Sequence, residues 1–243
     1  MPRLVSVLVP SSLLSLLAGA ASAQLPGLPT APGAFVRPGI AVAANAGVET
    51  DALPATDGGG GRRSRWTYGG AAAFARGGGR WQVAGGVAAQ SWGDGYQSPA
   101  TALGARGAFA AWRGARLGAT AFAGIGLARA RLAEVEGAGD DPAVVSLRQL
   151  PVGAAVGMRG AWGGGARAWS VAVAPQYVWY RLAVGEDEVT DARPRVGLLA
   201  EVGLTPRLGV SVAYEDGARA AAGDPGPRGG TFGLALSFAL GGW

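Results

Sequence analysis

The sequence contains no cysteine, no histidine and no lysine, so all 21 of its basic residues are arginine. Without cysteine, the chain has neither a disulfide framework nor a thiol that could act as a nucleophile. Without histidine, it also lacks the Ser-His and Cys-His pairs on which many hydrolases depend. These absences exclude the most familiar forms of nucleophilic catalysis.

Long apolar runs are also missing after the N-terminal 23 residues. Every apolar stretch is broken by Gly, Pro or Arg before it reaches the roughly 20 residues that a transmembrane helix needs. If such a chain enters a membrane, it must do so as a closed β-barrel, which satisfies the backbone hydrogen bonds without helices.

The N-terminus has the parts of an export signal. Arg3 precedes a short apolar run, and Ala21-Ser22-Ala23 forms a small-x-small cleavage pattern. We therefore predict a signal peptide over residues 1–23 and a mature chain that begins at Gln24. The alternative, an uncleaved membrane anchor, fits less well because the apolar run is short and contains a proline.

Residues 24–34 are rich in Pro, Gly and Ala and are predicted to form a leader before a barrel over residues 35–243. Within this barrel region, ten segments alternate apolar residues with small or polar ones. They are 36–48, 66–74, 81–90, 103–109, 117–127, 149–159, 169–179, 196–204, 208–215 and 231–238. Most are close to the roughly 9–11 residues that a tilted strand needs to cross a bilayer.

The connections between these segments alternate between short and long. Tight turns are predicted at 77–79, 113–114, 163–165 and 205–207, and longer polar loops at 51–63, 93–99, 133–146, 184–194 and 216–229. The fold predicted is all-β: a transmembrane, antiparallel, up-and-down β-barrel of about ten strands, with eight as the alternative. A soluble β-sandwich is a further alternative, but ten apolar faces would then need a second apolar layer.

The charged and aromatic residues fit this topology. The acidic residues gather at the ends of the segments that carry the long loops, and tryptophans lie near segment ends, where they would form two girdles at the membrane surfaces. We therefore expect the acidic loops to be extracellular and both termini to be periplasmic, in the outer membrane of a bacterium.

The last segment, Thr231-Phe232-Gly233-Leu234-Ala235-Leu236-Ser237-Phe238, has four apolar residues on one face. The chain resembles small bacterial outer-membrane β-barrel proteins of the OmpA-like type. This segment is similar to their C-terminal assembly signal, with Thr231, Gly233, Leu236 and Phe238 at the specified positions. The resemblance implies the barrel-assembly machinery, membrane lipid and lipopolysaccharide as partners. Because Ala239 to Trp243 follow, either Phe238 or Trp243 is the terminal aromatic.

The predicted inward positions are mostly Gly and Ala, but they include five charged residues: Arg37, Arg106, Arg159, Glu201 and Glu215. A bare charge in a narrow lumen is costly unless it is paired or hydrated. In one interpretation, Arg, Glu and Gln side chains pair, close the lumen, and leave the barrel a structural or surface-interaction role. In the other, the barrel is a narrow, low-conductance channel for small solutes or ions. The ligand and the oligomeric state do not follow from the sequence.

No catalytic residue and no cofactor are predicted. A carboxylate-based enzyme is a remote alternative, resting on acidic pairs in the predicted loops. These pairs are Glu134 with Glu136, Asp140 with Asp141, and Glu186 with Glu188. The densest acidic cluster, Glu186, Asp187, Glu188 and Asp191, is a weak candidate for a Ca²⁺ or Mg²⁺ site, and a solvated loop tip is the preferred explanation.

The arginines suggest a lipid contact rather than a nucleic-acid site. They are spread over many segment ends instead of forming one patch, so the basic pI does not indicate nucleic-acid binding. Arg129 and Arg131 follow the outward parity of segment 117–127. There they would lie at the level of lipopolysaccharide phosphates, unless a β-bulge turns them toward water.

Overall fold

The computed structural model describes residues 33–37, 39–51, 63–75, 79–90, 96–132, 144–162, 167–184, 187–217 and 230–240. Ten β-strands lie in these ranges. They are β1 (Gly39–Asp51), β2 (Arg63–Ala75), β3 (Trp81–Gln90), β4 (Tyr96–Arg113), β5 (Leu117–Leu132), β6 (Val144–Trp162), β7 (Arg167–Val184), β8 (Asp187–Gly203), β9 (Leu208–Gly217) and β10 (Gly230–Ala239). In the described part of the chain, no helix has the length and apolar character needed to cross a membrane.

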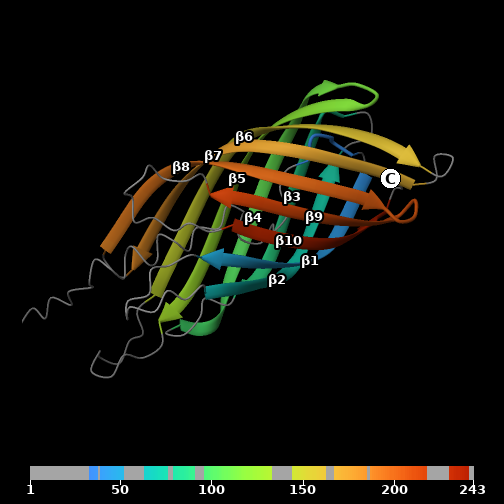
Figure 1. Cartoon of the computed structure of the whole chain (residues 1–243). Helices are drawn as coiled ribbons and strands as arrows, with labels where there is room; N and C mark the ends of the chain where they lie inside the picture. Colours follow the sequence, from blue (N-terminus) through green and yellow to red (C-terminus); the bar gives the residue numbers. More distant parts are fainter. Residues whose placement is uncertain are drawn as a thin grey trace, which may run out of the picture.

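The strands form a closed barrel in the order β1-β10-β9-β8-β7-β6-β5-β4-β3-β2 (Figure 1). Each strand pairs antiparallel with its neighbours in sequence, and β1 pairs with β10 from Ala41↔Ala239 to Thr50↔Gly230. The predicted all-β, up-and-down fold and the count of ten strands are confirmed, and the alternative of eight is wrong. Closure leaves no free sheet edge, which is what a β-structure needs in lipid.

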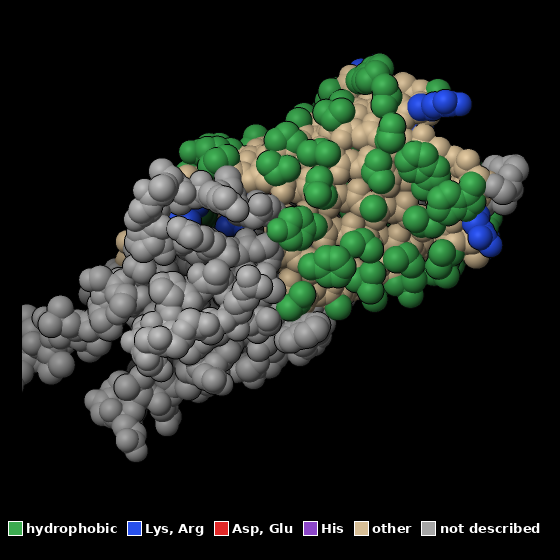
Figure 2. Space-filling model, viewed as in Figure 1, with side chains coloured by type: hydrophobic (Ala, Val, Ile, Leu, Met, Phe, Trp, Pro, Cys, Tyr) green, Lys and Arg blue, Asp and Glu red, His purple; other side chains and the backbone are tan. Residues whose placement is uncertain are grey.

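The outer wall of the barrel is apolar. The alternate residues of β10, Phe232, Leu234, Leu236 and Phe238, all point outward and are 40–51% exposed. The same pattern covers the neighbouring strands, and Figure 2 shows hydrophobic side chains spread over the wall, with arginines at one end. A wall of this composition is suited to lipid rather than to water.

Aromatic and basic residues mark the limits of the apolar wall. Along β7 the outward positions are, in order, Arg167, Trp169, Val171, Val173, Pro175, Tyr177, Trp179 and Arg181. The apolar run therefore covers 169–179, with an aromatic ring at each end and an arginine beyond each ring. Its length matches the roughly 9–11 residues of a tilted membrane-spanning strand, and aromatic rings favour the two membrane surfaces.

We call the end of the barrel with the longer connections the loop end, and the end with the tight turns the turn end. At the loop end the strands extend further than the sequence predicts. The clearest difference concerns the loop predicted over 184–194, which is wrong. β7 continues to Val184 and β8 begins at Asp187, so only residues 185 and 186 separate them. The register runs unbroken from Val184↔Asp187 to Trp169↔Val202. Once the outward side chains become polar, the alternation no longer marks a strand, but the backbone pairing continues.

The first strand begins later than predicted. The prediction started it at Val36, whereas β1 starts at Gly39, and residues 33–37 lie outside any strand. Gly39 has a φ of 107°, a conformation that residues with a side chain rarely adopt. The glycine therefore allows the change of direction with which the chain enters the barrel wall.

The interior of the barrel holds two apolar clusters of mostly small residues. One, nearer the loop end, contains Val145 and Leu147 of β6, Tyr180 of β7 and several alanines from β3 to β5. The other, nearer the turn end, contains Phe122 and Leu199 with alanines from β4 to β9, and Ala34 and Phe35 pack into it. The space inside the wall is therefore partly filled with side chains, as expected for a barrel of this size.

Candidate functional site in the barrel interior

The segment that precedes β1 folds into the barrel. Ala34 is 1% exposed and belongs to the turn-end apolar cluster. The carbonyl oxygen of Gly33 accepts a hydrogen bond of 2.8 Å from the hydroxyl of Thr120 on the inner face of β5. We call residues 33–37 the inner segment. The boundary predicted between leader and barrel, at residues 34 and 35, falls inside it.

Two glycines on the wall make room for the inner segment. Gly118 on β5 and Gly157 on β6 are directly opposite each other in the register. A Cβ atom on Gly118 would lie 2.5 Å from the ring of Phe35. One on Gly157 would lie 2.2 Å from the carbonyl oxygen of Val171 on β7 and 2.8 Å from the Cβ of Ala34. These distances are too short for real atoms, so only glycine lets the inner segment approach the wall this closely.

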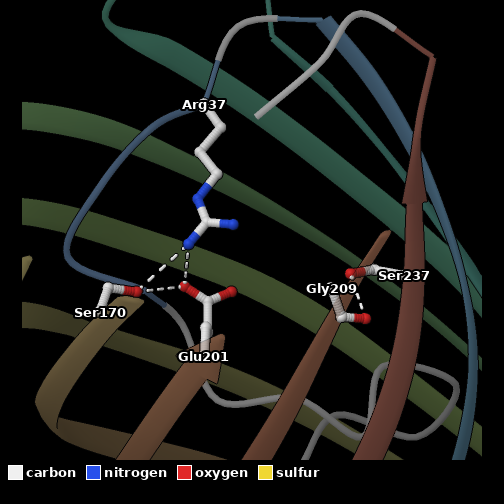
Figure 3. A network of polar contacts seen from close by, with 5 residues as sticks. All are labelled: Arg37, Ser170, Glu201, Gly209 and Ser237. Carbon is white, nitrogen blue, oxygen red and sulfur yellow. Dashed lines mark hydrogen bonds and ion pairs between the residues drawn. The ribbon is translucent and has the colours of Figure 1, made fainter. Parts of the chain in front are cut away.

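An ion pair fixes the end of the inner segment. Arg37 donates a hydrogen bond of 2.7 Å to Glu201 on β8 and one of 3.2 Å to the hydroxyl of Ser170 on β7. Ser170 itself donates to the same carboxylate oxygen of Glu201, at 2.6 Å. Figure 3 shows Arg37 reaching from the inner segment toward the two wall residues. The Arg37 and Glu201 side chains are 30% and 23% exposed, so water reaches the pair.

A second group of polar side chains is buried in the barrel interior. Gln176 on β7 donates a hydrogen bond of 2.6 Å to Glu215 on β9, and both side chains are buried. The register places Gly197 of β8 opposite Glu215 and Arg195 of β8 opposite Gln176, so the hydrogen bond crosses β8 diagonally, beside a position that has no side chain. Arg106 on β4 interacts electrostatically with both Glu201 and Glu215. It therefore connects the two groups across the interior.

A third polar group lies toward the loop end. The hydroxyl of Tyr180 on β7 donates a hydrogen bond of 2.6 Å to Asp191 on β8, and the Nε of Arg193 donates one of 2.9 Å to the same oxygen. The guanidinium of Arg193 also lies 5.9 Å from the centre of the Tyr180 ring. The alternation of the sequence did not identify this group, because both Asp191 and Arg193 lie in the loop predicted over 184–194.

One interior residue lacks a partner in the described part of the protein. Asn45, on the inner face of β1, is 7% exposed, and neither its amide nitrogen nor its oxygen has a hydrogen-bond partner among the described residues. Buried amides are nearly always satisfied by protein or by water. Asn45 therefore indicates a site for water on this side of the lumen.

The five predicted lumen residues have different surroundings. Arg37, Arg106, Glu201 and Glu215 are brought together as described, although Arg37 comes from the inner segment and not from a strand. Arg159 lies at the rim, exposed, and donates to the backbone oxygens of Ala115 and Gly114. Its guanidinium also lies 4.8 Å from the centre of the Phe35 ring. Arg159 thus contacts the inner segment through Phe35 and takes no part in the Glu201 network.

The predicted acidic cluster is divided between the two faces of β8. Glu188 points outward and pairs with Arg181 of β7, whereas Asp191 points inward and binds Tyr180 and Arg193. Asp187 belongs to the same strand, and Glu186 lies outside the described residues. Within the described ranges, no three carboxylates are grouped so that they could hold a metal ion. Glu134, Glu136, Asp140 and Asp141 also lie outside these ranges.

The residues of the predicted assembly signal all lie on β10. Thr231 and Gly233 face inward and are buried, and Leu236 and Phe238 face outward. Phe238 is opposite Val42 on β1 and Leu208 on β9, so it lies at the seam where the barrel closes. Trp243, the alternative terminal aromatic, is outside the described residues.

Arg129 and Arg131 are both on the outer face of β5. Exposed and buried residues alternate without interruption from Leu117 to Arg131, so the suggested β-bulge that would turn the two arginines does not occur on this strand. Elsewhere on the outer wall, Val156, Val173 and Leu198 line a concavity of about 550 Å³ with apolar sides. Apart from Tyr214, its lining side chains are aliphatic or glycine, so it is suited to apolar contacts.

Comparison with known proteins gives a fold and no family. No family model and no curated protein matches the sequence. The structure is similar to the translocator domain of the autotransporter NalP from Neisseria meningitidis, with a TM-score of 0.50 and 10% identity, over 85% of this chain and 90% of that one. It also matches the β domain of the Bordetella autotransporter BrkA, with a TM-score of 0.48 and 15% identity, over 83% of this chain and all of the other (100%). The fold is that of bacterial outer-membrane β-barrels.

Proposed function

We propose that this protein is an integral outer-membrane β-barrel with a structural or surface-interaction role, and that its lumen is closed to solutes. The observation that carries the proposal is the inner segment, which occupies the turn end of the lumen between the Gly118–Gly157 wall and Glu201. Gln176, Glu215 and the strand residues of the turn-end apolar cluster, into which Ala34 and Phe35 pack, fill the interior further. In this proposal the lumen is closed by two components, the predicted polar network and the inner segment.

We also propose that the barrel has no catalytic activity. The chain has no histidine or cysteine, and the described carboxylates of Glu188, Asp191, Glu201 and Glu215 are each bound by an arginine, tyrosine, serine or glutamine. A general base must lie within hydrogen-bond reach of the proton that it abstracts from a substrate. The interior carboxylates instead join strands to one another and to the inner segment.

A narrow channel is the second candidate function. Asn45 is favourable to this alternative, because its buried amide has no partner among the described residues and a water in the lumen would satisfy it. The partial exposure of Arg37 and Glu201 also fits a hydrated path around the inner segment. In that case the inner segment would narrow the path without sealing it, and Glu201 would contribute a negative charge to ion selectivity.

Single-channel recording in planar bilayers tests the proposal. We expect no steady conductance from the wild-type protein. The Gly118→Ala variant adds a Cβ whose nearest neighbours all belong to the inner segment, so it should displace that segment and allow conductance. The matched control is Gly107→Ala, since a Cβ on this other glycine of the barrel wall meets nothing within 4 Å.

The outcomes separate the two functions. A closed wild type, an open Gly118→Ala variant and a closed Gly107→Ala variant would support closure by the inner segment. Steady conductance from the wild type would overturn it in favour of the channel. If neither variant conducts, the inner segment is not the barrier, and closure would have to come from the packed interior alone.

A further inference from the structure

The outer wall changes from apolar to basic within one outward position of the register on three neighbouring strands. On β5 the outward residue after Leu127 is Arg129, on β6 the outward residue next to Leu150 is Arg148, and on β7 Trp179 is followed by Arg181. Arg131 lies one outward position beyond Arg129. We call Arg129, Arg131, Arg148 and Arg181 the basic patch. It is exposed, and it borders the apolar wall at the loop end of the barrel.

Two of these arginines are direct cross-strand partners. Arg148 is opposite Arg181 in the register, and both point outward. Side chains in such positions have Cβ atoms only about 5 Å apart, and like charges there destabilise a sheet. Among the described residues, only one carboxylate pairs with the patch: Glu188, which binds Arg181. Four positive charges therefore share one described negative charge on a small area.

The surroundings of the patch are suited to an anion with several oxygen atoms. Arg129 lies between Thr101 of β4 and Ser146 of β6, whose hydroxyls are on the same face. Arg181 lies next to Thr190 of β8 in the same way. Since neighbouring strands are about 4.8 Å apart, the arginines of β5 and β7 are separated by roughly 10 Å. Guanidinium groups bind phosphate through paired hydrogen bonds, and hydroxyls can donate further ones.

We infer that the basic patch is a binding site for the phosphates of a lipid headgroup, and specifically for those of lipopolysaccharide. The patch adjoins Trp179 and the apolar wall, so a lipid bound there keeps its acyl chains on the wall while its phosphates reach the arginines. A lipid with more than one phosphate matches a patch that covers three strands. The inference depends on the proposed orientation, in which the loop end faces the outer leaflet.

Binding of lipopolysaccharide to the folded protein in vesicles of neutral phosphatidylcholine tests this inference. Replacing Arg148 and Arg181 together by Gln should weaken binding roughly 30-fold, as expected for two arginines at an anionic lipid surface. The matched control is Arg116→Gln with Arg207→Gln, which removes two exposed arginines at the opposite end of the barrel. It should change the affinity less than twofold. If the double variant does not fold, Arg129→Gln alone should still weaken binding.

Further measurements decide the identity of the ligand. Vesicles that contain phosphatidylglycerol, which has one phosphate, should compete weakly with lipopolysaccharide. Equal competition would overturn the assignment to lipopolysaccharide, and an equal loss in the control variant would overturn the site itself. The single-channel recordings on the same double variant should match the wild type, because the patch is outside the lumen. Failure of the binding test would thus leave the proposed closed lumen untouched.

Discussion

The carboxylate of Glu201 interacts with three side chains in the barrel interior. It accepts hydrogen bonds from Arg37 and Ser170 and interacts electrostatically with Arg106. Its loss leaves the guanidinium of Arg37 in the lumen without its acid partner. When an ion pair is fully buried, removing one partner costs about 3–5 kcal/mol. This pair is 30% and 23% exposed, so water compensates part of that loss.

We therefore expect Glu201→Ala to lower the free energy of unfolding by about 1.5–3 kcal/mol, the range for a hydrogen bond to a charged group. Glu201→Gln, which keeps an oxygen acceptor for Ser170 and Arg37, should lose less. Urea unfolding of the refolded barrel in detergent measures both. Equal stability of all three proteins would mean that the network does not hold the inner segment. A shift toward anion selectivity with unchanged stability would favour the hydrated channel.

At the level of single residues, the sequence predicts direction better than partnership. Parity alone placed Arg106, Glu201 and Glu215 inside. It could not show which interior side chains contact one another. Gln176 and Glu215, for example, form a hydrogen bond although their strands, β7 and β9, are not neighbours. The inner segment, residues 33–37, crosses the predicted boundary: its first two residues were assigned to the leader and its last three to the barrel, so nothing in the sequence marked it as one unit inside the lumen. Gly118 and Gly157 look like other lumen glycines until the register places Phe35 and Ala34 against them.

At the level of strands, β10 has two roles that a mutation can separate. Its outward residues belong to the apolar wall, and Phe238 also lies at the seam between β1 and β9. We expect Phe238→Ala to lower the folded fraction, because it removes the predicted recognition residue at the closing strand. The matched control is Leu234→Ala, on the same strand and face but outside the predicted signal positions.

Gly233→Asp should lower the folded fraction for a different reason. Gly233 is buried on the inner face, opposite Gly47 of β1 and Ala213 of β9. None of these residues can pair with a carboxylate, and a buried unpaired charge is costly. For these variants the measurement is the fraction of fast-migrating, unheated protein on a gel. If Phe238→Ala folds as well as Leu234→Ala, the signal is misplaced, and Trp243 becomes the terminal aromatic.

The strands themselves were predictable in number and face, but not in their ends. Within the membrane, outward side chains must be apolar, so the sequence alternates strictly. Beyond it, both faces can be polar, and Glu188, Asp191 and Arg193 gave no alternation although they lie on β8. Backbone pairing does not depend on side-chain polarity, and it continues along the β7–β8 hairpin. The predicted loop there was an inference from the length and polarity of the segment between two alternating stretches.

For the whole molecule, the binary pattern is sufficient to specify the fold. The chain shares only 10% of its residues with the NalP translocator domain, and the fold is nevertheless of the same kind. A closed barrel needs apolar residues outside, small residues inside, and turns at the right spacing, and many sequences meet these conditions. The function is not specified in the same way, because it depends on particular side chains in the lumen and on the wall.

The orientation of the molecule is the last property that the topology predicts. Because the number of strands is even, β1 begins and β10 ends at the turn end, where Ala41 is opposite Ala239. A protein inserted from the periplasm leaves its short turns there and exposes its longer acidic loops outside. The chain has no cysteine, so a single introduced thiol reports on one position without background.

We expect Thr190→Cys, on the exposed loop-end part of β8, to react with a membrane-impermeant maleimide on intact cells. Ala115→Cys, in the exposed turn between β4 and β5, should react only after the outer membrane is opened. The unheated gel mobility of each variant shows that its barrel is folded. The opposite labelling pattern would invert the barrel in the membrane and would place the basic patch in the inner leaflet. The patch would then face phospholipid, so its assignment to lipopolysaccharide would also be lost.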